Sequence, residues 1–452
     1  MMQSREIDIH IGDQSISGVA HTPKAIALLK NGIWAYFFLL IFEGALRKWV
    51  LPGLATPLLV IRDPLALWIL IVANRRGLIP FNFYVLGMML IGIVSIFTAI
   101  FLGHKNLFVA IYGSRILLFH FPLIFAIGNI FSKKDVIEMG KMIIYIAIPM
   151  TILIALQFYS PQSAWVNRGV GGDVTGAGFS GAEGYFRPPG TFSFTNGTSL
   201  FYSLLAPFIF YFWLHPGKLN KWVLIVGTIG LLVSIPLSIS RGLFFSVIVT
   251  LLFVLLATIQ KPKYGKFVLV SGVGLVISLF VLSNFAFFEN AIQAFTSRFE
   301  VANQVEGGVK GVLADRYLGG MTSALTDNSP HSPFFGYGIG MGTNVGSMLL
   351  TGGTRFLISE GEWGRLIGES GILIGFIIIF LRLRISAKMA LAAYRKLAKD
   401  NLLPWFLLSF ALLQIPQGQW AQPTSLGFSI LIGGLLIASL KDPKSRTANV
   451  EK

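Results

Sequence analysis

Arginine is the residue type in this sequence best suited to binding a charged substrate. Arg187 opens the stretch FRPPGTFSFTNGTSLFY, and Arg241 stands in SISRGL, so each precedes a long apolar run. A planar guanidinium group binds two phosphate oxygens at once, which makes a phosphate or diphosphate the expected ligand. The alternative is that both side chains extend to lipid phosphates at a membrane surface and have no further role.

The composition predicts an all-α polytopic membrane protein. Apolar residues make up 54% of the 452 residues and charged residues only 12%, about half the share in ordinary soluble domains. We expect about twelve transmembrane helices, because apolar stretches long enough to cross about 30 Å of hydrocarbon recur along the chain. Their approximate ranges are 26–43, 54–73, 79–102, 107–131, 136–159, 190–214, 222–239, 243–260, 267–288, 366–383, 402–417 and 424–440. The chain has no cysteine, so disulfides and cysteine-bound metals are excluded.

The basic residues predict the orientation of these spans. Of the 36 Lys and Arg residues, 23 lie in the two tails and on the tail side of the spans, against 11 on the opposite side. The positive-inside rule therefore places both tails, 1–25 and 441–452, in the cytoplasm. This bias and anionic lipids account for the net charge of +16, so no nucleic acid partner is needed. The outer set holds eight Arg and three Lys, which favours a phosphate ligand on that face.

Two long outer segments carry most of the polar residues. Residues 160–190 are rich in glycine and have little secondary-structure signal. Residues 289–365 form a large periplasmic helical loop, with two amphipathic helices and then the glycine-rich HSPFFGYGIGMGTNVG. We expect this loop to act as a lid between the spans within 26–288 and those within 366–440.

The order of these motifs resembles the O-antigen ligase and O-antigen polymerase family, which are bacterial membrane glycosyltransferases of surface polysaccharide. RPPGTF is followed by SRG after the next span, and then by a large outer loop with DRY, SPFFGYGIGMG and ESGILIG. The resemblance covers roughly residues 140–380. It implies that a glycan on undecaprenyl diphosphate is transferred to an acceptor hydroxyl at the periplasmic face of the inner membrane, with no metal and no cofactor.

The resemblance implies a diphosphate-binding role for Arg187 and Arg241. Thr191 and Asn196 are then expected to line a polar cleft beneath Arg187. Backbone N–H groups at the start of the helix, freed by the prolines and Gly190, would add to the anion site. The same threonine and its hydroxyl neighbours equally suit helix packing.

A base on the acceptor side is the second implied role. A sugar hydroxyl is a poor nucleophile, so a neighbouring group must take or orient its proton. The family commonly has a histidine near the end of the large loop, whereas this sequence has Glu360 there, nine residues before Glu369. We predict Glu360 as the base, with Glu362 and His331 as alternatives and a structural role as the last reading. Direct displacement predicts inversion of the anomeric configuration.

Other outer residues are candidates for substrate binding. Arg316, Arg355 and Arg365 complete the arginine set, although Arg316 is equally suited to a simple ion pair. Arg365 lies a little more than one helical turn from Glu360 and Glu362, near enough to pair with either. Trp363 offers a flat face for a sugar, and its alternative role is that of a membrane anchor.

Four ionisable residues fall inside predicted spans. Arg62 and Asp63 stand in VIRDPLAL, and Arg115 and His120 in YGSRILLFHFPL. Such groups are costly in a bilayer and are therefore functional candidates. Mutual neutralisation of Asp63 and Arg115 is the leading reading, followed by a substrate groove and a proton path. The proline after Asp63 predicts a break in that helix.

The predicted function is polymerisation of undecaprenyl-diphosphate-linked repeats into O-antigen or exopolysaccharide. A ligase differs only in its acceptor, such as a lipid A core, and the glutamate in place of histidine favours the polymerase. A transporter or flippase is the third reading, and the internal repeats it requires are not evident. Expected partners are the lipid-linked oligosaccharide, membrane lipids and a chain-length regulator.

Overall fold

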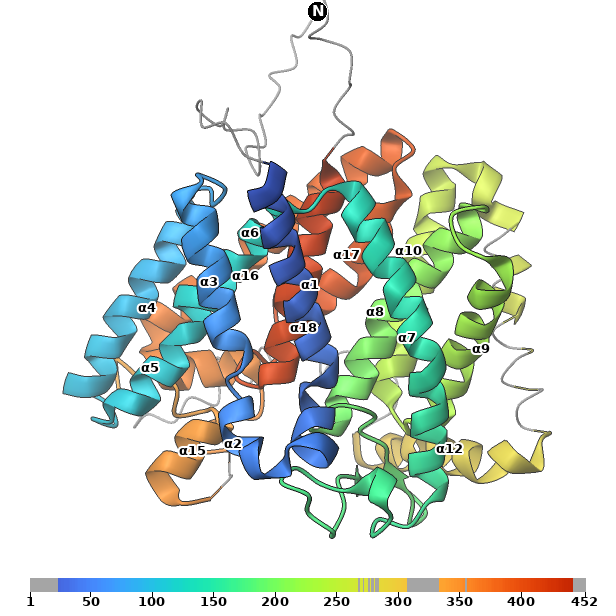
Figure 1. Ribbon diagram of the computed structural model, residues 1–452, viewed down its shortest axis with the longest axis horizontal. Helices are drawn as coiled ribbons and strands as arrows, with labels where there is room; N and C mark the ends of the chain where they lie inside the picture. Colours follow the sequence, from blue (N-terminus) through green and yellow to red (C-terminus); the bar gives the residue numbers. More distant parts are fainter. Residues whose placement is uncertain are drawn as a thin grey trace, which may run out of the picture.

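The computed structural model describes residues 23–266, 284–306, 333–353 and 356–441, with short pieces between 269 and 280. Most of these residues are helical (Figure 1). Nine helical segments in the described part are long and apolar enough to cross a membrane, and two shorter apolar helices, α9 (Lys221–Leu237) and α17 (Leu402–Gln414), accompany them. This confirms an all-α membrane protein. The span predicted at 267–288 lies largely outside the described residues, so the number twelve stays a prediction.

Most of the described helices follow one another with short connections, and the connection between α7 (Lys133–Tyr159) and α8 (Thr195–Leu214) is long. The long elements are α1 (Pro23–Ala45), α3 (Arg62–Arg75), α4 (Phe83–Phe101), α5 (Leu107–Arg115), α6 (Phe121–Ile130), α7 (Lys133–Tyr159), α8 (Thr195–Leu214), α9 (Lys221–Leu237), α10 (Arg241–Gln260), α12 (Ala286–Glu306), α16 (Glu362–Ala398), α17 (Leu402–Gln414) and α18 (Pro423–Leu440). The short ones are η1 (Leu46–Val50), η2 (Pro52–Leu54), α2 (Ala55–Leu58), η3 (Ile116–His120), η4 (Trp165–Asn167), β1 (Phe179–Ser180), β2 (Phe186–Arg187), η5 (Pro262–Tyr264) and α15 (Asn344–Thr351).

Helix α18 is the central element of the bundle. It packs against α6, α17, α8 and α7 and is buried along nearly its whole length. At Gly433 and Gly434 the backbone of α18 lies close to Ile124 and Ile127 of α6. A larger side chain at either glycine would collide with these isoleucines. Small residues at such contacts are typical of helix packing in membranes.

The first and last described residues of the chain lie at the same end of the helix bundle. Lys30 near the start of α1 pairs with Asp135 at 2.6 Å, and Lys441 after α18 donates to the Asn129 carbonyl at 2.7 Å. Residues 160–190, α12 and α15 lie at the opposite end (Figure 1). Both described ends therefore lie on one side, as an even number of crossings requires.

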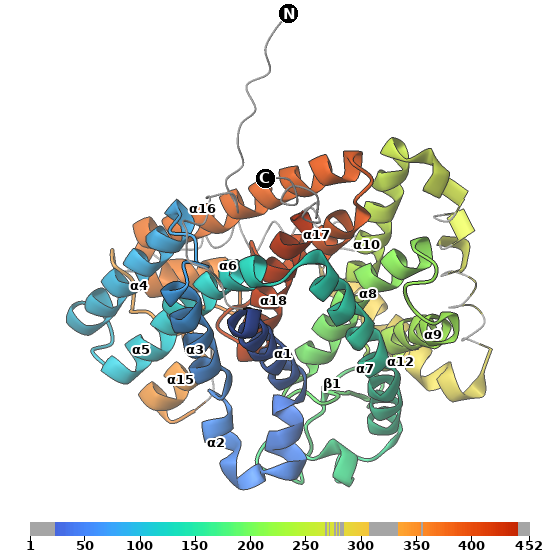
Figure 2. The ribbon, with the colours of Figure 1, turned by 45° about the horizontal axis from the view of Figure 1, so that its top comes forward.

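Helix α16 is folded back on itself and is not one straight rod. Gly371 has φ 77° and ψ 168°, which interrupts the helix. Residues 362 and 382 would be about 30 Å apart in a straight helix, yet Arg382 Nη1 lies 2.6 Å from Glu362 Oε1. The long second part runs along α17, between α4 and α10 (Figure 2). The span predicted at 366–383 therefore begins only after Gly371. Arg382, counted with the inner basic residues, is fully buried in contact with Glu362.

The segment 160–190 is more ordered than its sequence indicates. Strands β1 and β2 form a small antiparallel pair in which Phe179 lies opposite Arg187. The buried Asn167 side chain donates to the carbonyls of Gln157, Ser160 and Pro161, at 3.0 to 3.1 Å. These bonds close the segment onto the end of α7.

The large outer loop is described in part. The first amphipathic helix predicted there is present as α12, which packs on α10 through Phe295 and Phe299 against Phe244. Ser297 Oγ also donates to Glu183 Oε1 at 2.7 Å, which joins α12 to the segment 160–190. Residues 307–332 and 354–355 lie outside the described residues, so the lid stays a prediction.

Candidate functional site

The RPPGTF segment is extended and precedes its helix. Helix α8 begins at Thr195, so Gly190 lies five residues before the helix, and the expected helix-start N–H groups are not at the prolines. Thr191 Oγ1 donates to the Ile41 carbonyl at 2.6 Å, which fastens the segment to α1. Asn196, in the first turn of α8, donates to Gln422 Oε1 at 2.5 Å.

Two basic residues that were not among the predicted site residues hold this segment. Lys48 Nζ donates to the Gly190 carbonyl at 2.7 Å, and Arg47 Nη1 donates to Ser193 Oγ at 2.9 Å. Both cations lie in the π-helical turn η1 and are buried. Adjacent cations at the end of an apolar helix, in ALRKWVLP, are the signal that could have identified them.

Positive charge is in excess beneath this segment. Glu43 lies 3.4 Å from Arg47 and 3.0 Å from Arg62, whereas Lys48 contacts a carbonyl and the Trp49 ring. Two buried arginines thus share the Glu43 carboxylate, and none of the ion pairs among the described residues includes Lys48. We call these three buried basic residues the cation group (Arg47, Lys48 and Arg62). Buried charge that is incompletely paired favours an anion nearby.

Arg187 and Arg241 belong to neighbouring elements. Ile239 lies beside the β1–β2 turn, because a side chain on Gly181 would meet both Ile239 and Arg187. Ile239 itself has φ 47°, two residues before Arg241. A β-branched residue in this region is strained, and such strain clusters at functional sites. The turn that begins α10 is therefore a candidate part of the site.

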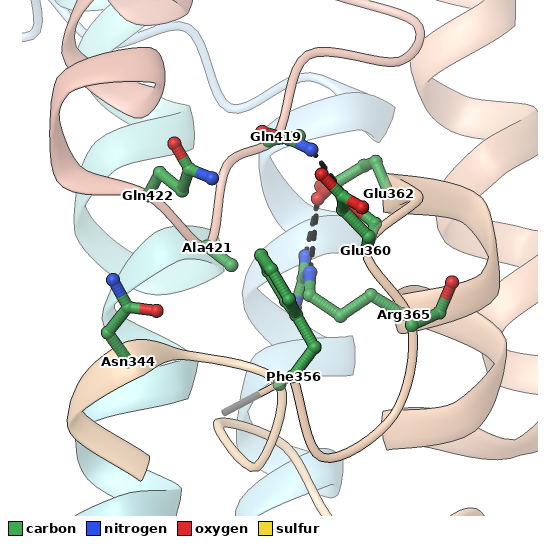
Figure 3. A pocket seen from close by; sticks show the side chains of 10 residues that line it. Asn344, Phe356, Glu360, Glu362, Arg365, Gln419, Ala421 and Gln422 are labelled. Carbon is green, nitrogen blue, oxygen red and sulfur yellow. Dashed lines mark hydrogen bonds and ion pairs between the residues drawn. The ribbon is translucent and has the colours of Figure 1, made fainter. Parts of the chain in front are cut away.

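A pocket lies at the same end of the bundle, around Glu360 (Figure 3). We call it the Glu360 pocket, and its lining residues are Gly342, Asn344, Phe356, Ser359, Glu360, Glu362, Arg365, Gln419, Ala421 and Gln422. The start of α16 and the segment before it supply one wall, and the connection between α17 and α18 supplies the opposite wall. Gly342 and Asn344 complete the lining. Amide, hydroxyl and carboxylate groups with one aromatic ring are a lining suited to sugar hydroxyls.

Glu360 and Glu362 have different surroundings in this pocket. Glu360 is exposed, and its backbone carbonyl accepts a hydrogen bond from the Gln419 side chain at 2.9 Å. Glu362 is buried, and Arg365 and Arg382 both donate to its carboxylate. The accessible carboxylate is therefore that of Glu360.

The buried charges of α16 form a neutral chain of ion pairs. Arg382 pairs with Glu362, Glu362 with Arg365 at 2.9 Å, and Arg365 with Glu369. Two guanidinium groups alternate with two carboxylates, which we call the ion-pair chain (Glu362, Arg365, Glu369 and Arg382). The pairing of Arg365 with a nearby glutamate is thus confirmed for Glu362. Complete pairing is what allows these charges to remain buried.

The glycine-rich GYGIGMG segment packs against the ion-pair chain. Gly342 N–H donates to Glu369 Oε1 at 2.8 Å, and Gly338 N–H donates to the Glu369 backbone carbonyl at 2.9 Å. Tyr337 N–H donates to the Gly368 carbonyl at 2.8 Å. The motif therefore positions α16, and its glycines permit the close approach.

The first turn of α8 joins the two regions. Ser199 Oγ donates at 2.8 Å to Ser240, the N-cap of α10, and Asn196 contacts Gln422 of the Glu360 pocket. Arg241 follows Ser240 directly. The start of α8 therefore contacts both the N-cap residue next to Arg241 and the Glu360 pocket.

The charges predicted within the spans form a second buried cluster. Arg115 Nη1 lies 2.7 Å from Asp63 Oδ1, and His120 Nε2 lies 2.9 Å from the same oxygen. The predicted Asp63–Arg115 pair is thus confirmed. A turn at residues 59–61 supplies the predicted helix break, and Arg62 beyond it donates to the Pro423 carbonyl at 2.7 Å.

The remaining candidates divide into two groups. Trp363 Nε1 donates to the Pro416 carbonyl at 3.0 Å, which ties α16 to the connection after α17. Arg316, His331 and Arg355 lie outside the described residues. Within the described part of the chain, no group of three His, Cys, Asp or Glu side chains is placed to hold a metal ion.

Comparisons with protein-family models, curated proteins and solved structures find no match for this chain. The class defined by the fold is a multi-pass helical membrane protein. The resemblance to the O-antigen family therefore rests on the sequence motifs alone.

Proposed function

We propose that this protein is a metal-independent glycosyltransferase that extends a glycan carried on undecaprenyl diphosphate at the outer face of a bacterial inner membrane. One observation carries the proposal. The first turn of α8 contacts both the N-cap of the helix that begins at Arg241 and the pocket that contains Glu360. Such a transfer requires cations to stabilise the leaving diphosphate and a carboxylate to take the proton of the acceptor hydroxyl.

The proposed reaction is a single displacement. The acceptor hydroxyl oxygen attacks the anomeric carbon as the bond from that carbon to the diphosphate oxygen breaks, and the electron pair leaves with the diphosphate. Arg187 and Arg241 stabilise the charge that grows on the leaving group. Glu360 takes the hydroxyl proton. The excess charge of the cation group supports an anionic donor at this end of the bundle.

Polymerisation of repeat units into O-antigen or exopolysaccharide is the form of this activity that we favour, because a glutamate occupies the position of the usual ligase histidine. Transfer to an acceptor such as lipid A core is the alternative. A transporter or flippase is less well supported, since the proposed donor and acceptor regions both lie at one end of the bundle.

A complementation experiment tests the proposal. A strain lacking the gene would carry the wild type, Arg187→Lys, Arg241→Lys or Glu360→Gln, and its surface polysaccharide would be separated by length, with membrane levels checked. We expect each variant to lose long chains and to accumulate lipid-linked single repeats, because lysine lacks the bidentate fork and glutamine cannot take a proton.

The alternative outcomes separate the candidate functions. Accumulation of long, unattached lipid-linked chains would identify a ligase. Variants that behave as the wild type would show that these residues do no chemistry. The buried Asp63 cluster would then be the next region to test.

A further inference from the structure

Arg382 lies beneath the Glu360 pocket and contacts both of its walls. Its Nη1 donates to Glu362 Oε1 at 2.6 Å, in the wall formed by the start of α16 and the segment before it. Its Nε donates to the Ile415 carbonyl at 2.7 Å, and its Nη2 donates to the Gly418 carbonyl at 3.0 Å, both in the opposite wall. One side chain therefore joins the two walls through three hydrogen bonds.

Further contacts show that the walls depend on this arrangement. The Arg382 guanidinium carbon lies 3.8 Å from the centre of the Trp420 ring, and Trp420 N–H donates to Glu362 Oε2 at 3.2 Å. The next residue toward the pocket, Gln419, donates to the Glu360 carbonyl. The position of Glu360 relative to the pocket amides thus follows from the position of Arg382.

The chemistry of arginine suits this role and that of lysine does not. Guanidinium donors point in set directions within one plane, so a carboxylate and two carbonyls can be bound at once. A lysine would keep the charge opposite Glu362 but would lack the planar fork. Arg382 is also fully buried, so it does not itself contact a substrate in the pocket.

We infer that Arg382 is a positioning residue, which sets the spacing between Glu360 and the amides of Gln419 and Gln422 that orient the acceptor. The activity part of this inference rests on the proposed function, whereas the geometric part does not. Misplacement of a reacting group by about 1 Å costs about 100-fold in rate.

Because the sequence has no cysteine, a single introduced thiol can report on the geometry of the pocket walls. Ser359→Cys places a single thiol in the pocket wall, and its reaction rate with a maleimide would be measured in the purified full-length protein. The rate of Ser359→Cys alone would be compared with the rates of three double variants, in which Arg382→Lys, Arg382→Met or Arg384→Met is added to it. Arg384 is the matched control, because it is exposed two residues further along the same helix and lies 5.4 Å from the Phe83 ring.

We expect Arg382→Lys to change the thiol reaction rate and to lower kcat about 100-fold, with the KM for the lipid-linked donor unchanged. Arg384→Met should alter neither. Kinetics would be measured without the added cysteine. Arg382→Lys retains the charge opposite Glu362, so it gives the result even where Arg382→Met does not accumulate.

Each other outcome decides the inference. A thiol rate and a kcat equal to those of the parent would overturn it. Loss of kcat with an unchanged thiol rate would also overturn it, because the effect would not pass through the pocket. A changed thiol rate with normal glycan product would support the positioning role and contradict the proposed function of the pocket.

Discussion

At the scale of single residues, the surroundings of a carboxylate indicate whether it is free to react with a substrate or is held in ion pairs that stabilise the fold. Glu360 and Glu362 are two positions apart, and the sequence alone leaves both open as the base. Glu362 accepts from two arginines and from the Trp420 N–H, so its oxygens are occupied. Glu360 presents an exposed carboxylate to the pocket. The structure therefore favours Glu360 for proton transfer and Glu362 for stability.

Substitution of each glutamate by glutamine should separate these roles. Glu362→Gln leaves two buried guanidinium groups with one carboxylate, which typically costs about 3–5 kcal/mol. We expect a large fall in the melting temperature of the detergent-solubilised protein. Glu360→Gln should leave melting unchanged and lower activity by about 100-fold or more. Equal melting of the two variants would refute this division.

At the scale of the element, the break at Gly371 decides what α16 can do. The first part of α16 brings Glu362 into the pocket, and the second part brings Arg382 beneath it. Gly371 adopts a left-handed φ, and a side chain there would collide with the Phe334 carbonyl. The apolar stretch at 366–383 predicted a simple span here, because apolar length alone does not reveal a break at Gly371. The break depends on a single glycine and on the chain packed against it.

Gly371→Ala should therefore disrupt the pocket. The left-handed conformation costs an alanine about 1–3 kcal/mol, and the collision adds to this. Gly352→Ala is the matched control, since Gly352 has a similar φ of 73° with open space around it. We expect Gly371→Ala to lower the melting temperature clearly more than Gly352→Ala. Similar melting would mean that the contact with Phe334 is loose.

At the scale of the whole molecule, the two ends of the bundle differ in chemistry. One end holds the described chain ends and pairs such as Lys30 with Asp135. The other holds the cation group, the Glu360 pocket and the first turn of α8. The proposed reaction requires this second end to face outward, as the distribution of Lys and Arg predicts.

Single cysteines test this orientation. Lys134→Cys lies in an exposed position at the end with the described chain ends, and Ser359→Cys lies in the pocket wall. If the pocket faces outward as predicted, an impermeant maleimide should label Ser359→Cys in spheroplasts. It should label Lys134→Cys only after the membrane is opened. The reverse pattern would place the pocket in the cytoplasm and rule out the proposed reaction.

The sequence by itself determined the class of protein and the positions of most spans, and it predicted the Asp63–Arg115 pair as the leading of three readings. These follow from apolar length, charge bias and the cost of an isolated charge in a bilayer. Only the tertiary structure decided which residues meet across the bundle. Lys48 meets Gly190, 142 positions away, and Arg382 meets Glu362 through a reversal of the chain. Local periodicity carries no information on such contacts, because they depend on how helices pack after each has formed.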